Sequence, residues 1–187
     1  MGATIHSLRH RVALDGIQDT QSCSIDWSRN WFLTAALEAG SDWLLMCDAD
    51  TWHGNMPGRP TVTNPAGDIL RMLETGAERQ AAVIAAPVRM RGRAGYNVFA
   101  AGEAPHIVEP TEWAGRVVEV DRIGTAFMAI SCAWIRACWP EQPWFLTQQL
   151  PGPKPKKIGE DVNFCDGVRA RGGVILADGR YEPNHIG

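Results

Sequence analysis

The sequence predicts an α/β protein with a mixed sheet flanked by helices, built as a single domain over residues 1–187. Segments with apolar residues at helical spacing alternate along the chain with short, continuous apolar runs that are typical of buried strands. The chain of 187 residues is long enough to bury one sizeable core. No internal repeat and no linker-like segment divides it.

The first well-defined element is a helix over residues 25–37. Apolar side chains recur there at helical spacing, and Gly40 follows at a place where helices commonly stop. Residues 42–47 form an apolar run that predicts a buried strand. The Asn-Pro pair at 64–65 combines a capping residue with a proline at the first helical position, which predicts a helix to Leu73.

The same alternation continues to the end of the chain. Further strands are predicted at residues 81–86, 97–101, 117–121, 125–130 and 174–177. Helices are predicted from the capping residue Ser131 to Cys138, and from Glu160 to Arg171, where two glycines follow. Residues 147–158 are rich in proline, glycine and lysine and predict a mobile loop.

Composition excludes several classes of protein. Hydrophobic residues make up 45% of the chain and charged residues 21%, as in ordinary soluble proteins. The net charge of −3 gives no sign of a general nucleic-acid or membrane surface, and no apolar stretch is long enough to span a membrane. No signal-peptide core is visible, and the five scattered cysteines favour reduced thiols in a cytoplasmic protein. Self-association stays compatible with this composition.

The sequence Asp48-Ala49-Asp50 directly follows the apolar run of the predicted strand. A strand that ends there delivers both carboxylates to the carboxyl end of the sheet, where open α/β folds bind ligands. Two aspartates two positions apart point the same way in an extended segment, and a cation relieves their repulsion. Carboxylate oxygens suit Mg²⁺ or Mn²⁺, so we predict a metal site that holds a phosphorylated ligand. The alternative is a solvated turn.

Three further groups of residues accompany this turn. Arg29 and Asn30 lie in the helix that precedes the strand. Gly124 and Thr125 precede an apolar strand, which favours a close approach of the backbone to a ligand. His185 becomes a third metal ligand if the chain folds back against the aspartate pair. The alternatives are a solvated helix surface, a plain strand-entry turn and a solvated terminal histidine.

Glu160 and Asp161 begin a predicted helix directly after Lys154, Lys156 and Lys157. The helix dipole favours acids at this position whether or not they have a function. A cationic loop beside paired carboxylates is also the arrangement of an active-site lid. In that arrangement one carboxylate takes a proton from an attacking hydroxyl group.

The order of these motifs resembles that of GT-A-type glycosyltransferases, close to the large family 2 group. The resemblance covers most of the chain and rests on Asp26-Trp27-Ser28-Arg29-Asn30, Asp48-Ala49-Asp50, Gly124-Thr125-Ala126-Phe127-Met128, Pro143-Trp144-Phe145, Gly159-Glu160-Asp161 and His185. It implies one GT-A-like, Rossmann-like domain. It also implies transfer of a sugar from a nucleotide-diphosphate sugar to a hydroxyl acceptor.

The resemblance assigns roles to the residues of these motifs. Asp50 is expected to ligate Mn²⁺ or Mg²⁺ directly, Asp48 to lie nearer the ribose and the metal, and His185 to complete the metal site. Asp161 is expected to activate the acceptor hydroxyl, with Glu160 as an acceptor contact. The nucleotide-binding residues are expected to be Arg29, Asn30, Asp48, Lys154, Lys156 and Lys157.

The chain departs from the family pattern at its start. Family members usually begin with a strand and a short loop that hold the nucleotide base. Here only residues 2–7 precede the first helical segment. The first nucleotide-binding strand is therefore expected to be missing or very short, which leaves open a domain that is incomplete at its N-terminus.

Two other functions stay open. The segment Asp48-Ala49-Asp50-Thr51 after an apolar strand also resembles haloacid-dehalogenase-type, Mg²⁺-dependent phosphatases, with Lys154 and Asp166 among the matches to later motifs. That interpretation ranks lower because it leaves the Gly124 segment and His185 without roles. A non-catalytic sugar-binding or nucleotide-binding relative is the third, supported by the missing first strand.

Overall fold

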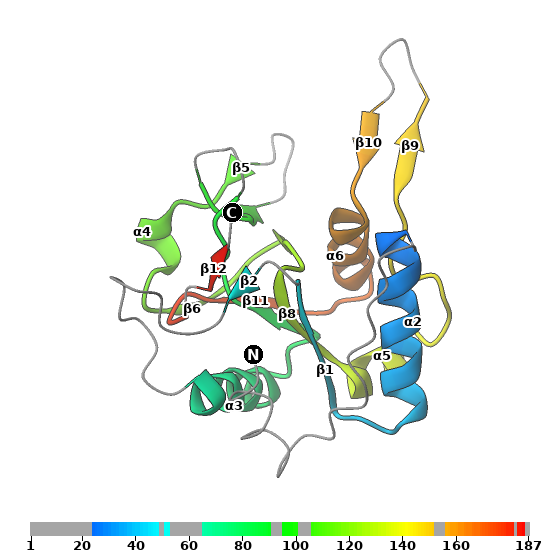
Figure 1. The fold of residues 1–187 in the computed structure, drawn as a ribbon, viewed down its shortest axis with the longest axis horizontal. Coiled ribbons are helices and arrows are strands. Elements are labelled where there is room, and N and C mark those ends of the chain that lie inside the picture. The colour runs from blue at the N-terminus through cyan, green and yellow to red at the C-terminus, as the bar shows by residue number, and fades with distance from the viewer. Residues whose placement is uncertain are drawn as a thin grey trace.

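A five-stranded mixed sheet lies at the centre of the molecule, with helices on both of its faces (Figure 1). The structure is a computed structural model that describes residues 24–48, 51–52, 65–90, 95–100, 106–151, 156–181 and 183–185. Within these residues the strand order of the central sheet is β1 (Trp43–Cys47), β8 (Phe127–Ser131), β3 (Val83–Ala85), β11 (Ile175–Asp178) and β6 (Val117–Glu119). Only β3 and β11 pair in parallel, which confirms the predicted mixed α/β sheet.

The remaining elements surround this sheet. The helices are α2 (Ile25–Glu38), α3 (Pro65–Glu78), α4 (Pro110–Trp113), α5 (Cys132–Cys138) and α6 (Glu160–Ala170). Small sheets are formed by β9 (Gln148–Leu150) with β10 (Lys156–Ile158), by β2 (Thr51–Trp52) with β12 (Asn184–His185), and by β4 (Val98–Ala100) between β5 (His106–Ile107) and β7 (Arg122–Ile123). Among the described residues, no helix combines the length and the apolar character needed to cross a bilayer.

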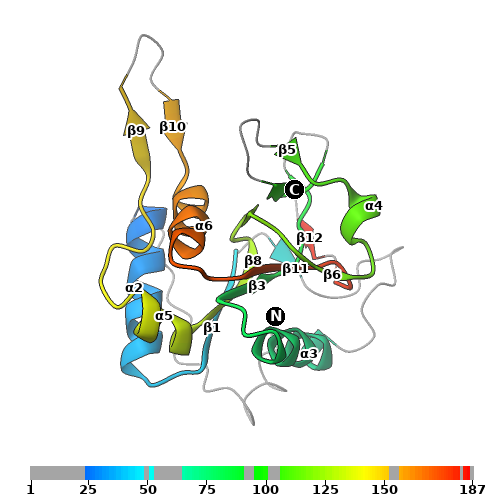
Figure 2. The same cartoon turned by 180° about the vertical axis from the view of Figure 1, so that it is seen from behind.

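Side chains of the central strands alternate between two cores. In β8, Met128 and Ile130 join the core that α2, α5 and α6 cover, whereas Phe127 and Ala129 join the core under α3. This alternation is the pattern of a strand buried on both faces. Figure 2 shows the same division from behind, with α3 apart from the other three helices.

Local sequence signals locate the helix ends well. The Ser131 hydroxyl accepts a hydrogen bond from the backbone N–H of Trp134 at 3.2 Å, which confirms its predicted capping role. Gly40 and Gly172 follow α2 and α6 with φ of 73° and 74°, a conformation that glycine adopts without strain. The Asn64 cap lies outside the described residues, and α3 runs past the predicted end to Glu78.

The prediction of a loop over residues 147–158 was wrong. Strands β9 and β10 pair there as an antiparallel hairpin, with Leu150 opposite Lys156 and Gln148 opposite Ile158. Figures 1 and 2 show this hairpin projecting away from the body of the molecule. Proline and glycine mark its turn region in the sequence, and backbone pairing across that region satisfies groups that a loop leaves to water.

Candidate functional site

The carboxyl end of β1 places Asp48 at the edge of the central sheet. The backbone N–H of Asp48 donates to the carbonyl of Ala126 at 3.0 Å, which continues the β1–β8 pairing by one residue. The N–H of Thr51 then donates to the Asp48 carbonyl at 2.9 Å, which closes a turn. The side chain of Asp48 is 39% exposed, so its carboxylate is accessible from solvent.

Arg29 joins two of the predicted motifs. Its side chain comes from α2 and is 8% exposed. One guanidinium nitrogen lies 3.4 Å from an Asp48 carboxylate oxygen, and the other donates to the Glu160 carboxylate. The guanidinium carbon also lies 6.0 Å from the ring centroid of Phe145. Residues that the sequence separates by more than a hundred positions therefore meet around one buried cation.

Asp161 is half-buried beside Glu160 at the start of α6. Its Oδ1 accepts a hydrogen bond from the backbone N–H of Val162 at 2.8 Å. Burial, and then the charge of Glu160, raise the pKa of the Asp161 carboxyl above its ordinary value. A Cβ atom on Gly159 would lie 2.6 Å from this Oδ1, so a larger residue before the helix would displace the Asp161 carboxylate.

This cluster is unbalanced in charge. Among the described residues, Arg29 forms ion pairs with Asp48 and Glu160, and Asp161 is affected by its charge without a direct bond. When the three acids are ionised the cluster carries an excess of negative charge, which favours a bound cation or a proton. The charge of Glu160 also contributes to the raised pKa of Asp161, after the larger effect of burial. Such a carboxyl group suits proton transfer better than a fully solvated one.

Asp50 lies outside the described residues, and so does the side chain of His185. The backbone of His185 is described, and it pairs with Thr51 in the β2–β12 sheet. The end of the chain therefore runs beside the residue that follows the aspartate pair. The Thr51 hydroxyl is buried and has no hydrogen-bond partner in the described part of the chain. No group of three metal-binding side chains occurs among the described residues.

Asn30 is fully engaged by the protein itself. Its side-chain nitrogen donates to the carbonyls of Asp26 and Phe145 at 2.9 and 2.7 Å. Its side-chain oxygen accepts from the backbone N–H groups of Trp144 and Phe145 at 2.9 and 3.0 Å. These bonds use the two donors and both lone pairs of the amide. The geometry favours a positioning role for Asn30, which holds Phe145 beneath Arg29, over the predicted nucleotide contact.

The surroundings of two other predicted features, the Gly124 turn and the lysine-rich segment, differ from those we expected. A Cβ on Gly124 would lie 2.6 Å from the side-chain nitrogen of Asn97, so this glycine accommodates a neighbouring side chain in the place where we expected a ligand. Lys157 is exposed on β10, Lys154 lies outside the described residues, and nothing is described of the Lys156 side chain. Of the lysines that we expected on a lid, Lys156 and Lys157 lie on strand β10 of the projecting hairpin.

Sequence reasoning missed the ion pair of Asp178 with Arg180 and a pocket beside the C-terminal end of α6. Asp178 is fully buried and receives two hydrogen bonds from the guanidinium of Arg180, at 2.8 and 2.6 Å. The two residues lie only two positions apart, and this short spacing of opposite charges is the sequence signal for the pair.

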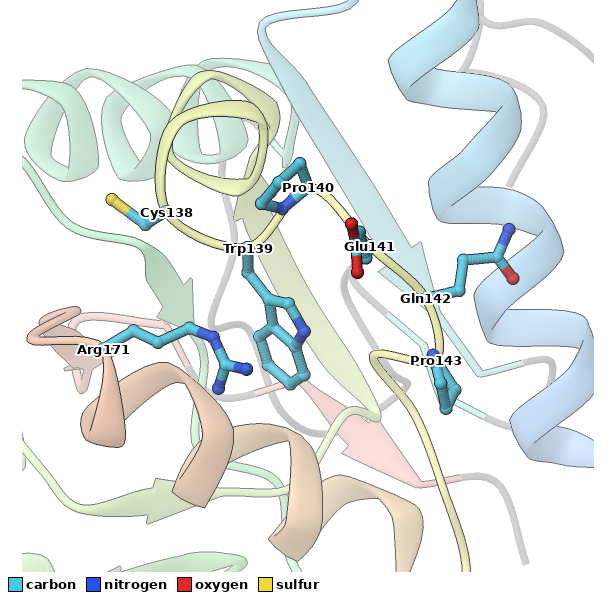
Figure 3. Close-up of a pocket in the computed structure, with 7 residues that line it drawn as sticks. All are labelled: Cys138, Trp139, Pro140, Glu141, Gln142, Pro143 and Arg171. Atoms are coloured by element: carbon cyan, nitrogen blue, oxygen red, sulfur yellow. The ribbon is translucent and has the colours of Figure 1, made fainter.

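A pocket of about 420 Å³ lies at the opposite end of α6 from Glu160 and Asp161. It is lined by Cys138, Trp139, Pro140, Glu141, Gln142, Pro143 and Arg171. The guanidinium carbon of Arg171 lies 4.2 Å from the Trp139 ring centroid, and Figure 3 shows the two side chains together at one side of the pocket. Phe164 stacks on the same indole at 5.9 Å. This aromatic ring is thus already in contact with other side chains, and the pocket does not coincide with the acidic cluster.

Comparison with known proteins gives information about the fold and none about the function. No protein-family model and no curated protein sequence matches the chain. Among solved structures, the crystal structure of A197 from STIV is similar, with a TM-score of 0.58 and 19% sequence identity over 87% of this chain and 68% of that chain. The chain therefore shares an α/β fold with A197 at a level of sequence identity that carries no functional conclusion.

Proposed function

We propose that this protein is a metal-dependent glycosyltransferase of the GT-A type that uses a nucleotide-diphosphate sugar and a hydroxyl acceptor. The observation that carries the proposal is the contact of Arg29 with both Asp48 and Glu160. It brings together the two acidic motifs on which the resemblance rests. The pairing of His185 with Thr51 adds the third motif from the end of the chain.

The residues at this site fit a divalent cation. Asp48 presents an accessible carboxylate, and the buried Thr51 hydroxyl nearby has no partner in the described part of the chain. Oxygen donors of this kind are the ligands that Mg²⁺ and Mn²⁺ take. In the proposal Asp48, Asp50 and His185 hold the ion. When bound, the ion would supply charge neutralisation for the leaving diphosphate.

Asp161 is the proposed general base. Its raised pKa moves the carboxyl toward neutral pH, where proton transfer is most effective. Arg29 holds Glu160 in an ion pair, so we propose that Glu160 shapes the cluster in addition to contacting the acceptor. Lys154, Lys156 and Lys157 stay proposed phosphate contacts.

The phosphatase interpretation is less well supported. It matched Asp166 to a later acidic motif, but Arg122 binds both oxygens of that carboxylate, at 2.6 and 2.8 Å. Its neutralisation by an arginine leaves Asp166 little capacity to assist at Asp48. Hydrolysis of p-nitrophenyl phosphate by the purified protein, lost in Asp48→Asn, would restore this interpretation.

Titration of nucleoside diphosphates with and without Mn²⁺ tests the proposal directly. We expect binding that requires Mn²⁺ and that Asp50→Asn abolishes, because the variant removes a charged ligand from the ion. Asp166→Asn is the matched control and should leave binding intact. Mn²⁺-dependent binding without sugar transfer would identify a non-catalytic relative, and the absence of any nucleotide binding would overturn the proposal.

A further inference from the structure

The pocket at the C-terminal end of α6 is lined by one cation and one anion that do not pair with each other. Arg171 stands at the end of α6, and Glu141 lies in the segment that follows α5. In the described part of the chain, Glu141 takes part in no hydrogen bond or ion pair, and no acid pairs with Arg171. The helix dipole explains a cation at this end of α6, but it gives no role to Glu141. Both charges are therefore available to a ligand.

The guanidinium of Arg171 is held in place by its neighbours. Its carbon lies 4.2 Å from the Trp139 ring centroid, and Nη1 donates to the carbonyl of Gly167 at 3.0 Å. These contacts use the indole and one nitrogen, and they leave other N–H groups of the guanidinium available. A guanidinium in a fixed position matches both oxygens of a carboxylate. Arg171 is thus prepared for a carboxylate that the protein itself does not supply.

An apolar wall that other contacts keep in position accompanies the two charges. The indole of Trp139 stacks on Phe164, with ring centroids 5.9 Å apart, and its backbone carbonyl accepts from the Trp144 indole nitrogen at 2.7 Å. The rings of Pro140 and Pro143 complete the wall. Figure 3 shows the indole with the cationic side chain on one side and the Glu141 carboxylate on the other. A pocket that is formed before binding avoids the cost of ordering its side chains.

The size and the charges of the pocket limit what it can hold. Its volume of about 420 Å³ lies within the range of small-molecule sites. A simple anion would bring a like charge to Glu141, and a simple cation would bring one to Arg171. A molecule with one carboxylate, one ammonium group and an apolar group satisfies both charges and covers the wall.

We propose that this pocket binds a small zwitterion of the amino-acid or dipeptide class that carries an apolar side chain. Its carboxylate pairs with Arg171, its ammonium group pairs with Glu141, and its side chain lies against Trp139 and the two prolines. The site lies at the opposite end of α6 from Asp161. The inference is independent of the proposed sugar transfer, because it uses none of the residues placed at the acidic cluster.

Isothermal titration calorimetry on the full chain tests the inference, with L-phenylalanine and glycyl-L-phenylalanine as probes and with no nucleotide or metal present. We expect saturable binding of at least one probe with a Kd of about 1 mM, a modest affinity for a small ligand in an open site. The N-acetylated probe lacks the ammonium group and the amidated probe lacks the carboxylate. Each should bind about tenfold more weakly, because each leaves one charge of the pocket unpaired.

Arg171→Gln and Glu141→Gln should each weaken binding of the zwitterion about tenfold. Arg71→Gln and Glu74→Gln make the same changes on α3, which covers the other core of the sheet, and should leave the affinity unchanged. Glu141→Gln removes no contact within the described part of the chain, so it keeps the test valid if Arg171→Gln lowers stability.

Three results would overturn the inference. They are the absence of saturable binding by either probe, equal affinity of the pocket variants and the wild type, and undiminished binding of the acetylated or the amidated probe. Undiminished binding of the acetylated probe would identify a site for simple anions instead. None of these readouts requires nucleotide binding, so their failure and the failure of the proposed sugar transfer are distinguishable.

Discussion

Two groups of charged side chains contact α6, and they differ in their balance of charge. At the start of the helix, Arg29 forms ion pairs with Asp48 and Glu160, and Asp161 adds a third carboxylate. Along the body of the helix, each acid has an arginine of its own: Asp166 binds Arg122, and Arg169 binds Asp121. The paired acids fasten α6 to β7, whereas the cluster at the helix start retains an excess of negative charge.

This difference shows which of the charged groups on α6 are explained by their ion pairs alone. A one-to-one ion pair needs no ligand, and the Arg122–Asp166 pair has two short hydrogen bonds and partly exposed side chains. Asp161 is half-buried, its pKa is raised, and the backbone N–H of Val162 donates to it. Gly159 occupies the N-cap position, so Asp161 is not the capping residue of α6.

The largest expected effect is on catalysis. Asp161→Asn should lower the rate of sugar transfer by roughly 10²–10⁴-fold, the usual contribution of a general base, while Mn²⁺-dependent nucleotide binding is retained. Asp166→Asn makes the same chemical change on the same helix and should leave the rate within about twofold, the change expected of a paired surface acid. Steady-state transfer assays check both variants. Equal losses would show that the effect comes from α6 as a whole.

The next effect is on stability. Arg29→Met should lower the free energy of unfolding by about 3 kcal/mol, because it leaves Glu160 buried without its cation. Arg122→Met should cost about 1 kcal/mol, since its partner Asp166 is 43% exposed. Urea denaturation at neutral pH measures both values. Similar costs for the two variants would contradict the distinction between the unbalanced cluster and the paired acids.

A smaller effect tests whether Asn30 positions its neighbours or contacts the nucleotide. Asn30→Ala removes four hydrogen bonds to the backbone and should lower the free energy of unfolding by about 2 kcal/mol. Asn163→Ala removes one bond, to the Leu146 carbonyl, and should cost about 1 kcal/mol or less. If Asn30→Ala instead weakens nucleotide affinity and leaves stability unchanged, the original prediction of a nucleotide contact is correct.

The smallest effect is on the pH dependence of stability. Because burial and then Glu160 raise the pKa of Asp161, the folded protein holds this proton more tightly than the unfolded chain does. The resulting stabilisation is present at pH values below the ordinary pKa of aspartate and is lost as pH rises through the folded pKa. Relative to Asp161→Asn, the wild type should therefore gain stability between about pH 7 and pH 4. Thermal unfolding across this range would contradict the prediction if the two curves stayed parallel.

The sequence by itself determined the features that depend on neighbouring residues. The spacing of apolar side chains located α2, whereas Ser131 marked the start of α5 and glycines marked the ends of α2 and α6 through hydrogen bonding and backbone conformation. The alternation of these elements also predicted the α/β class, because each must bury one face against another. The motif order included both Asp48 and Glu160, which the structure places on the same guanidinium of Arg29.

Only the tertiary structure decided which side chains meet. Arg29 and Glu160 lie 131 positions apart, and no local pattern predicts that one guanidinium bridges Asp48 and Glu160. The same holds for the four hydrogen bonds of Asn30, for the packing of Gly124 against Asn97 and for the β9–β10 hairpin. These contacts depend on how distant segments pack and satisfy one another's polar groups, and that is settled only when the whole chain folds.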